Sequence, residues 1–126
     1  EWVDWGETLQ DNVVMGGELR PQRLQQVLDC CGIALLPSTP LLSKQHGGDR
    51  ELLQRVMLAR GVYASRDLYL LDEPLAGCPL EARISTVRTL LRTVLRGRAV
   101  LVASSSYALA QEAAEDIMVL LRGGRA

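Results

Sequence analysis

Leu68-Tyr69-Leu70-Leu71-Asp72-Glu73-Pro74 is the stretch that decides the fold of this chain. Four apolar residues in a row are followed at once by two acids and a proline. A short, continuous apolar run is typical of a strand that is covered on both faces. Ligands of open α/β sheets bind beyond the carboxyl ends of the strands. The stretch therefore predicts a buried strand that delivers two adjacent carboxylates to the edge of a sheet.

The sequence after this strand alternates between helical and strand patterns. Apolar residues recur at three and four over residues 80–96, and a second apolar run spans residues 99–103. A brief helix is expected over residues 107–114 and a third strand over residues 116–121. Strand, helix, strand, helix, strand is the order of a parallel sheet with helices on its faces. The second half of the chain is therefore predicted to be α/β.

The sequence before the strand is mostly helical in pattern. We expect a loop with a short helical turn up to residue 17, a helix over residues 21–31, and a loop over residues 37–48. A longer helix is expected to follow Asp49, which is placed to cap it, and to run to about residue 64. The join between the two halves falls near residue 66, which divides the chain into segments 1–66 and 67–126.

Composition excludes several classes of protein. With 126 residues, 48% of them hydrophobic, the chain is one domain or less with an ordinary core. A net charge of −1 supplies no field for nucleic acid or anionic membrane. The only histidine, His46, and the three cysteines lack the spacing of a zinc site. The cysteines are expected to be small, buried or part-buried hydrophobic residues. The only lysine, Lys44, does not lie in a Gly-Lys-Ser/Thr string, so the chain contains no P-loop.

Some other residues have two readings each. We expect Trp2 and Trp5 to be packing residues, with a membrane-domain contact as the alternative. The arginines on one side of residues 83–96 are expected to be solvated, with a domain contact as the alternative. They are Arg83, Arg88, Arg92 and Arg96.

Asp72 and Glu73 carry the chemistry. Consecutive residues at a strand end point in different directions, so the two acids suit different tasks. One faces a hydrated Mg²⁺ and the other faces a water that attacks phosphate, which is the Walker B arrangement. The alternative is that the pair merely ends a strand and caps the turn before Pro74.

Residues 54–63, Gln-Arg-Val-Met-Leu-Ala-Arg-Gly-Val-Tyr, precede residues 70–75, Leu-Leu-Asp-Glu-Pro-Leu, by a six-residue spacer. This arrangement closely resembles the nucleotide-binding domain of ATP-binding cassette transporters, above all the multidrug-resistance-associated exporters. Residues 8–16 and 114–120 are similar to further parts of that domain. The resemblance implies the C-terminal part of a P-loop NTPase cassette domain, a mostly parallel sheet with flanking helices plus the helical subdomain. Residues 1–66 would hold the helical subdomain and residues 67–126 the Walker B, D-loop and switch-loop region. The P-loop would lie upstream of Glu1.

The family motifs are altered at three places. The Leu-Ser-Gly-Gly-Gln signature falls in register on Gly48, Asp49, Arg50, Glu51 and Leu52, so two carboxylates stand where the family faces phosphate. Ser104 stands where the family has the switch histidine, and a serine hydroxyl lacks the charge of imidazole. Pro79 replaces the usual D-loop aspartate. We therefore expect a degenerate nucleotide site.

The resemblance implies ATP and Mg²⁺ as cofactors, with Asp72 holding the metal through water and Glu73 acting on the attacking water. The implied partners are a second nucleotide-binding domain and the transmembrane domains of an exporter, at the cytoplasmic face of a membrane, with no nucleic acid. The chain alone, without a P-loop, is not expected to hydrolyse ATP. Two alternatives stay open: a non-catalytic dimerisation or regulatory module with the same fold, and a soluble cassette ATPase.

Overall fold

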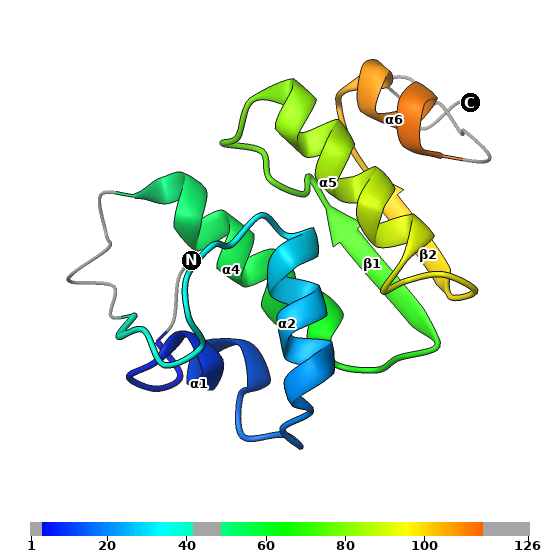
Figure 1. Cartoon of the computed structure of the whole chain (residues 1–126). Coiled ribbons are helices and arrows are strands. Elements are labelled where there is room, and N and C mark those ends of the chain that lie inside the picture. The colour runs from blue at the N-terminus through cyan, green and yellow to red at the C-terminus, as the bar shows by residue number, and fades with distance from the viewer. Residues whose placement is uncertain (1–3, 42–48, 115–126) are drawn as a thin grey trace.

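The computed structural model describes residues 4–41 and 49–114 as helices around a small parallel sheet (Figure 1). The elements in chain order are α1 (Leu9–Val14), α2 (Pro21–Cys30), α4 (Arg50–Tyr63), β1 (Leu68–Asp72), α5 (Leu80–Arg92), β2 (Ala99–Ala103) and α6 (Tyr107–Ala113). The mixed α/β character predicted from the sequence is confirmed in this part of the chain. The predicted third strand, over residues 116–121, lies outside the described residues.

β1 and β2 pair in parallel, with α5 as the crossover between them. The register joins Leu68 to Ala99 at one end and Asp72 to Ala103 at the other. Both strands therefore end at the same edge of the sheet. The division at residue 66 remains a prediction, since the strands and helices are compatible with it but do not test it.

α5 ends four residues earlier than the apolar pattern predicts, at Arg92 instead of residue 96. The hydroxyl of Thr93 donates to the carbonyl of Thr89, and the N–H of Leu95 reaches back to the carbonyl of Leu90. The chain thus turns after Thr93, which brings Leu95 into the core, where it is 1% exposed. The apolar period continued past Arg92 because Leu95 is buried by a turn.

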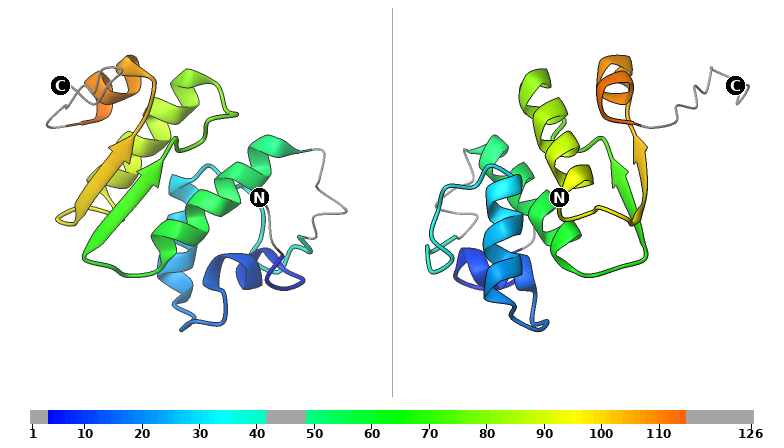
Figure 2. Two further views of the ribbon diagram at one scale, coloured as in Figure 1. Left: turned by 180° about the vertical axis from the view of Figure 1, so that it is seen from behind. Right: turned by 45° about the vertical axis from the view of Figure 1, so that its right-hand side comes forward.

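The expectation that both faces of the strands are covered is wrong for the described residues. Along β1 burial alternates: Tyr69 and Leu71 are buried, whereas Leu68 and Leu70 are 55% and 68% exposed. On β2 the Leu101 side chain is 64% exposed. The helices lie against one face of the sheet, and in the described part of the chain no element covers the other (Figure 2). The apolar residues on that face are therefore left in solvent.

The buried side-chain amide of Asn12 connects several segments of the helical half. α1 packs against α4, and α2 contacts α1, α4 and α5. The side chain of Asn12, 0% exposed, donates to the carbonyls of Gly6, Thr8 and Leu41. Arg60 on α4 donates to the backbone carbonyl of Asn12 at 2.7 Å. These bonds connect the segment before α1, the loop before residue 42, and α4.

Candidate functional site

Glu73 and Ser104 meet because the two parallel strands end together. Asp72 pairs with Ala103, so the next residue of each strand, Glu73 and Ser104, leaves the sheet at the same edge. The N–H of Glu73 continues the ladder by one bond, to the carbonyl of Ala103 at 2.7 Å. The two positions that the sequence selected from separate motifs are thus neighbours in space.

The Glu73 carboxylate lies in a cradle of donors. Its Oε1 accepts a hydrogen bond from the backbone N–H of Ser105 at 2.6 Å. Its Oε2 lies 3.4 Å from the hydroxyl of Ser104 and 3.2 Å from Nη2 of Arg83. The Glu73 backbone has a φ of 43°, a left-handed conformation that costs a non-glycine residue energy. This conformation breaks the alternation of the strand, and the carboxylate lies against the segment after β2.

Asp72 has a different environment from its neighbour. It is the last residue of β1 and lies on the exposed face of the strand, in line with Leu68 and Leu70. Within the described part of the chain its carboxylate has no hydrogen-bond or ion-pair partner. One acid is therefore open to solvent and the other is held by the protein, and the separate tasks expected of them from the sequence remain a prediction.

Hydrogen bonding keeps Glu73 ionised. Hydrogen bonds from Ser105 first, and then the hydrogen bond and charge of Arg83, hold the pKa of the Glu73 carboxyl below its ordinary value, although burial acts in the opposite direction. All of these donors stabilise the charged form and none of them favours the acid. At neutral pH this group is a carboxylate.

One carboxylate does not make a complete metal site. Among the described residues, no three histidine, cysteine or acidic side chains come close enough to hold an ion together. The open Asp72 carboxylate suits Mg²⁺, which keeps several waters and takes one or two protein carboxylates. The residues present thus fit a hydrated Mg²⁺ that this chain contacts through the Asp72 carboxylate, with water and groups outside the described residues as its other ligands.

The positions that the sequence analysis aligned with the signature lie at and before the beginning of α4. Asp49 is its N-cap, and Oδ1 of Asp49 accepts a hydrogen bond from the N–H of Leu52 at 2.9 Å. Glu51 pairs with Arg55 one turn later at 2.8 Å, and Arg50 is exposed. Gly48 lies outside the described residues. A carboxylate of the chain itself therefore occupies one of the amides at this helix end, that of Leu52.

The sequence analysis missed two contacts at the site. Arg83, expected on a solvated helix side, is 11% exposed and pairs with Glu73, so that expectation is wrong for this residue. The sequence analysis assigned no contact to Gln54, whose Oε1 accepts a hydrogen bond of 2.7 Å from the N–H of Gly77. The sequence offered one signal for Arg83: it lies in the first turn of α5, ten residues after Glu73 and close to it along the chain.

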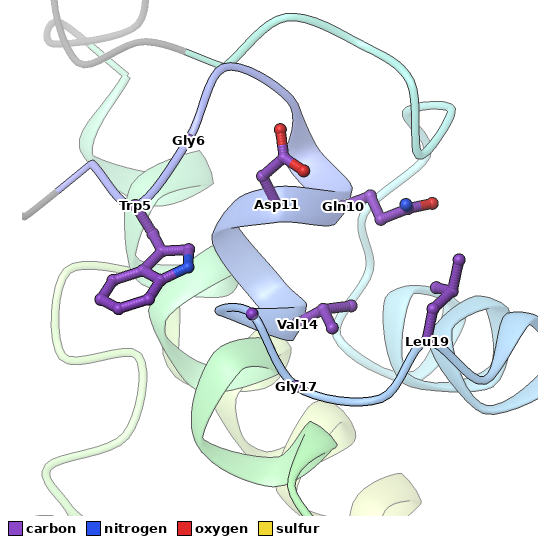
Figure 3. Close-up of a pocket in the computed structure, with 8 residues that line it drawn as sticks. Trp5, Gly6, Gln10, Asp11, Val14, Gly17 and Leu19 are labelled. Carbon is purple, nitrogen blue, oxygen red and sulfur yellow. The ribbon is translucent and has the colours of Figure 1, made fainter.

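A hollow of about 280 Å³ lies away from the two acids, between the segment before α1 and the link from α1 to α2. Figure 3 shows the indole of Trp5 beside α1, with Leu19 on the chain that leads to α2. Trp5 is 55% exposed, so the packing role expected for it is not what the structure shows. Trp2 and His46 lie outside the described residues. In the part of the chain that is described, no helix combines the length and the apolar character that crossing a membrane requires.

No protein-family model matches the chain. Human ATP-binding cassette sub-family C member 2 is 39% identical over 87 residues, which cover 60% of this chain and 5% of that protein. Human ATP-binding cassette sub-family C member 3 is 42% identical over 81 residues, 55% of this chain and 5% of that protein. A multidrug resistance protein of Leishmania tarentolae is 32% identical over 134 residues, 98% of this chain and 8% of that protein.

These similarities place the chain in the ATP-binding cassette transporter family. Within the family, its relatives are C-subfamily transporters and multidrug resistance proteins. The aligned parts make up only 5–8% of the length of these relatives.

Proposed function

We propose that the chain forms part of a nucleotide-binding domain of an exporter, in which ATP binding and hydrolysis are coupled to movement of a solute across a membrane. The observation that carries this proposal is the end of β1. There, two adjacent carboxylates stand in contrasting environments at the edge of a parallel sheet, one open and one held by donors. Phosphoryl transfer to water needs two such groups, one for the metal and one for the nucleophile.

In this proposal Asp72 binds a hydrated Mg²⁺ through water, and Glu73 orients or deprotonates the attacking water. Mg²⁺ supplies neutralisation of phosphate charge when it is bound with ATP. The chain's own residues do the positioning. The register of β1 and β2 fixes the distance between Glu73 and Ser104, and Ser104 occupies the place of the γ-phosphate sensor.

The nucleotide site is proposed to be degenerate on the side of α4. Amides at a helix N-terminus bind anions, and a signature motif uses them for phosphate. Here Asp49 already accepts the N–H of Leu52, so its carboxylate competes with any phosphate for the same donors. The Asp49 carboxylate and a phosphate are both negatively charged, so the carboxylate also repels the phosphate. Ser104, with no ionisable group in place of the switch histidine, is a separate weakness at the edge of the sheet.

Three surfaces suit the partners of a cassette domain. The exposed apolar face of the sheet, with Leu70 and Leu101, is where the rest of a cassette core would pack. The segment that follows Glu73 would face a second nucleotide-binding domain. The hollow beside Trp5, with Leu19 on its rim, would receive a part of the transmembrane domains, which puts the chain at the cytoplasmic face of the membrane.

The dependence of ATP binding on Mg²⁺ in the transporter that carries this chain tests the proposal. Asp72→Asn removes the open carboxylate, and the Mg²⁺ concentration for half-maximal binding is expected to rise about tenfold. Asp67→Asn is the matched control, because Asp67 precedes the other end of β1 and is fully exposed. The proposal fails if the two variants have the same Mg²⁺ dependence.

A second candidate function is a non-catalytic dimerisation or regulatory module with the cassette fold. The Asp49 carboxylate at the beginning of α4 favours it, because a site that must bind phosphate gains nothing from an internal anion there. This module would bind its partner domain without ATP. A soluble cassette ATPase is a further alternative, and no contact in the described residues favours it over an exporter.

A further inference from the structure

Arg83 joins the catalytic edge of the sheet to the first turn of α5. Its Nη2 lies 3.2 Å from Oε2 of Glu73 and 3.5 Å from the hydroxyl of Ser104. Its Nε donates to the carbonyl of Pro74 at 3.2 Å. One guanidinium thus contacts the side chain of Glu73 and the backbone of the next residue.

The burial of Arg83 makes this contact specific. Its side chain is 11% exposed, whereas that of Arg92 on the same helix lies in solvent. A guanidinium that has left water needs an anion, and here the anion is Glu73. The same turn holds two residues in left-handed conformations, Glu73 at 43° and Leu75 at 57°. Such strain persists only where surrounding contacts enforce it, and Arg83 supplies two of them.

The same contacts restrict what Glu73 can do. A general base must accept a proton from a water at hydrogen-bond distance. In this arrangement both carboxylate oxygens already have donors, Ser105 on Oε1, and Arg83 with Ser104 on Oε2. These three donors take three of the roughly four lone-pair directions of the carboxylate. The positive charge of Arg83 also stabilises its ionised form, so Glu73 takes a proton from water less readily than a free carboxylate does.

We propose that Arg83 is a positioning residue that latches Glu73 onto the turn between β2 and α6 and thereby restrains turnover at this site. The inference rests on the proposed function, because it assigns a restraint to the residue that acts on the attacking water. The latch opens when the carboxylate exchanges the hydrogen bond from Arg83 for one from a water.

ATP turnover by the transporter that carries the chain tests the latch. Arg83→Gln keeps a polar side chain, shortens it and removes its charge, so kcat is expected to rise roughly three- to tenfold with KM unchanged. Arg83→Lys keeps a charge that can reach one carboxylate oxygen, and its kcat is expected to stay near that of the unmodified protein. Arg92→Gln, an equal loss of charge on the exposed side of α5, is the control. A kcat for Arg83→Gln equal to or below that of Arg92→Gln overturns the latch.

Hydrogen exchange at residues 104–106 in the same transporter separates the latch from the proposed function. Freeing Glu73 weakens its bond to the N–H of Ser105, so this amide is expected to exchange faster in Arg83→Gln and not in Arg92→Gln. Unchanged exchange in Arg83→Gln contradicts the latch whatever the activity. If Glu73→Gln alone leaves turnover unaltered, the proposed function fails, and the exchange measurement still decides whether Arg83 holds Glu73.

Discussion

The side-chain oxygen of Gln54 lies 2.7 Å from the backbone nitrogen of Gly77 and accepts its hydrogen bond. Gln54 belongs to α4, and Gly77 to the loop that connects Glu73 with α5. A Cβ at Gly77 would approach the Gln54 amide nitrogen to 2.7 Å, so the two segments touch closely. The helical half of the chain thus holds the loop that follows the two acids, 23 residues further along the sequence.

We expect Gln54→Ala to lower the free energy of unfolding by about 0.5–1.5 kcal/mol, the usual net contribution of one hydrogen bond. Urea unfolding followed by circular dichroism measures the change. Gln25→Ala is the control, because Gln25 makes only an exposed bond to Asp29 within α2. Equal effects of the two substitutions would mean that the contact with Gly77 adds no stability.

Leu70 and Leu71 test whether the sheet is covered on one face. Leu71 is 9% exposed and packs in the core, so Leu71→Ala is expected to cost about 2–4 kcal/mol of unfolding free energy. Leu70 is 68% exposed on the same strand, so Leu70→Ala is expected to cost less than about 0.5 kcal/mol. The measurement is unfolding of the 126-residue chain in urea. A large loss for Leu70→Ala would show that something covers the second face in solution.

Asn12 is predicted to be the most sensitive polar residue of the helical half. Asn12→Ala leaves the carbonyls of Gly6, Thr8 and Leu41 without their shared donor, and the N–H of Trp5 without its acceptor. We expect a loss of about 2 kcal/mol or more in the free energy of unfolding. Asp29→Ala, on the exposed side of α2, is the comparison in the same unfolding experiment and should change stability by less than about 0.5 kcal/mol.

Cys31 makes stability depend on alkaline pH. Burial raises the pKa of the Cys31 thiol to about 12, from an ordinary value of 9.0. The unfolded chain therefore loses this proton first as the pH rises. The contribution of Cys31 is complete below pH 9.0 and is lost between that value and about pH 12. The slope within this window is about 1.4 kcal/mol per pH unit.

Unfolding free energies of the native chain and of Cys31→Ala, measured below and above pH 9, check this prediction. The alanine variant is expected to start less stable, because it leaves a small cavity, and to lose less stability at high pH. The account of Cys31 is wrong if both proteins lose stability in parallel. Alkylation of the folded chain offers a second reading, since the buried thiol should react only after unfolding.

The order of elements was predictable because apolar period and capping residues act locally. Asp49 caps α4 as expected, and β2 has the predicted bounds. The burial of the strands was not predictable from the same pattern. Leu68, Leu70 and Leu101 are as apolar as residues of a covered strand, and a sequence shows only that a face is apolar, whether or not an element of the chain lies on it.

The contacts of the site were less predictable than its location. The pair Asp72 and Glu73 identified the sheet edge, and the end of the second apolar run identified Ser104. Arg83 was misjudged because the spacing of arginines on a helix describes that helix alone. Its partner, Glu73, lies ten residues earlier, across a turn. Glu73 and Leu75 are left-handed in this turn, and neither is a glycine or asparagine, the residues that favour this conformation.

The rate of ATP hydrolysis by the transporter that carries this chain, with and without Glu73→Gln, tests the central claim most directly. Glu81→Gln is the control, an exposed acid in the first turn of α5. The account predicts a fall in the turnover of this site by about a hundredfold or more for Glu73→Gln, and no change for Glu81→Gln. Equal turnover in the unmodified protein and in Glu73→Gln would contradict the assignment of Glu73 as the residue that acts on the attacking water.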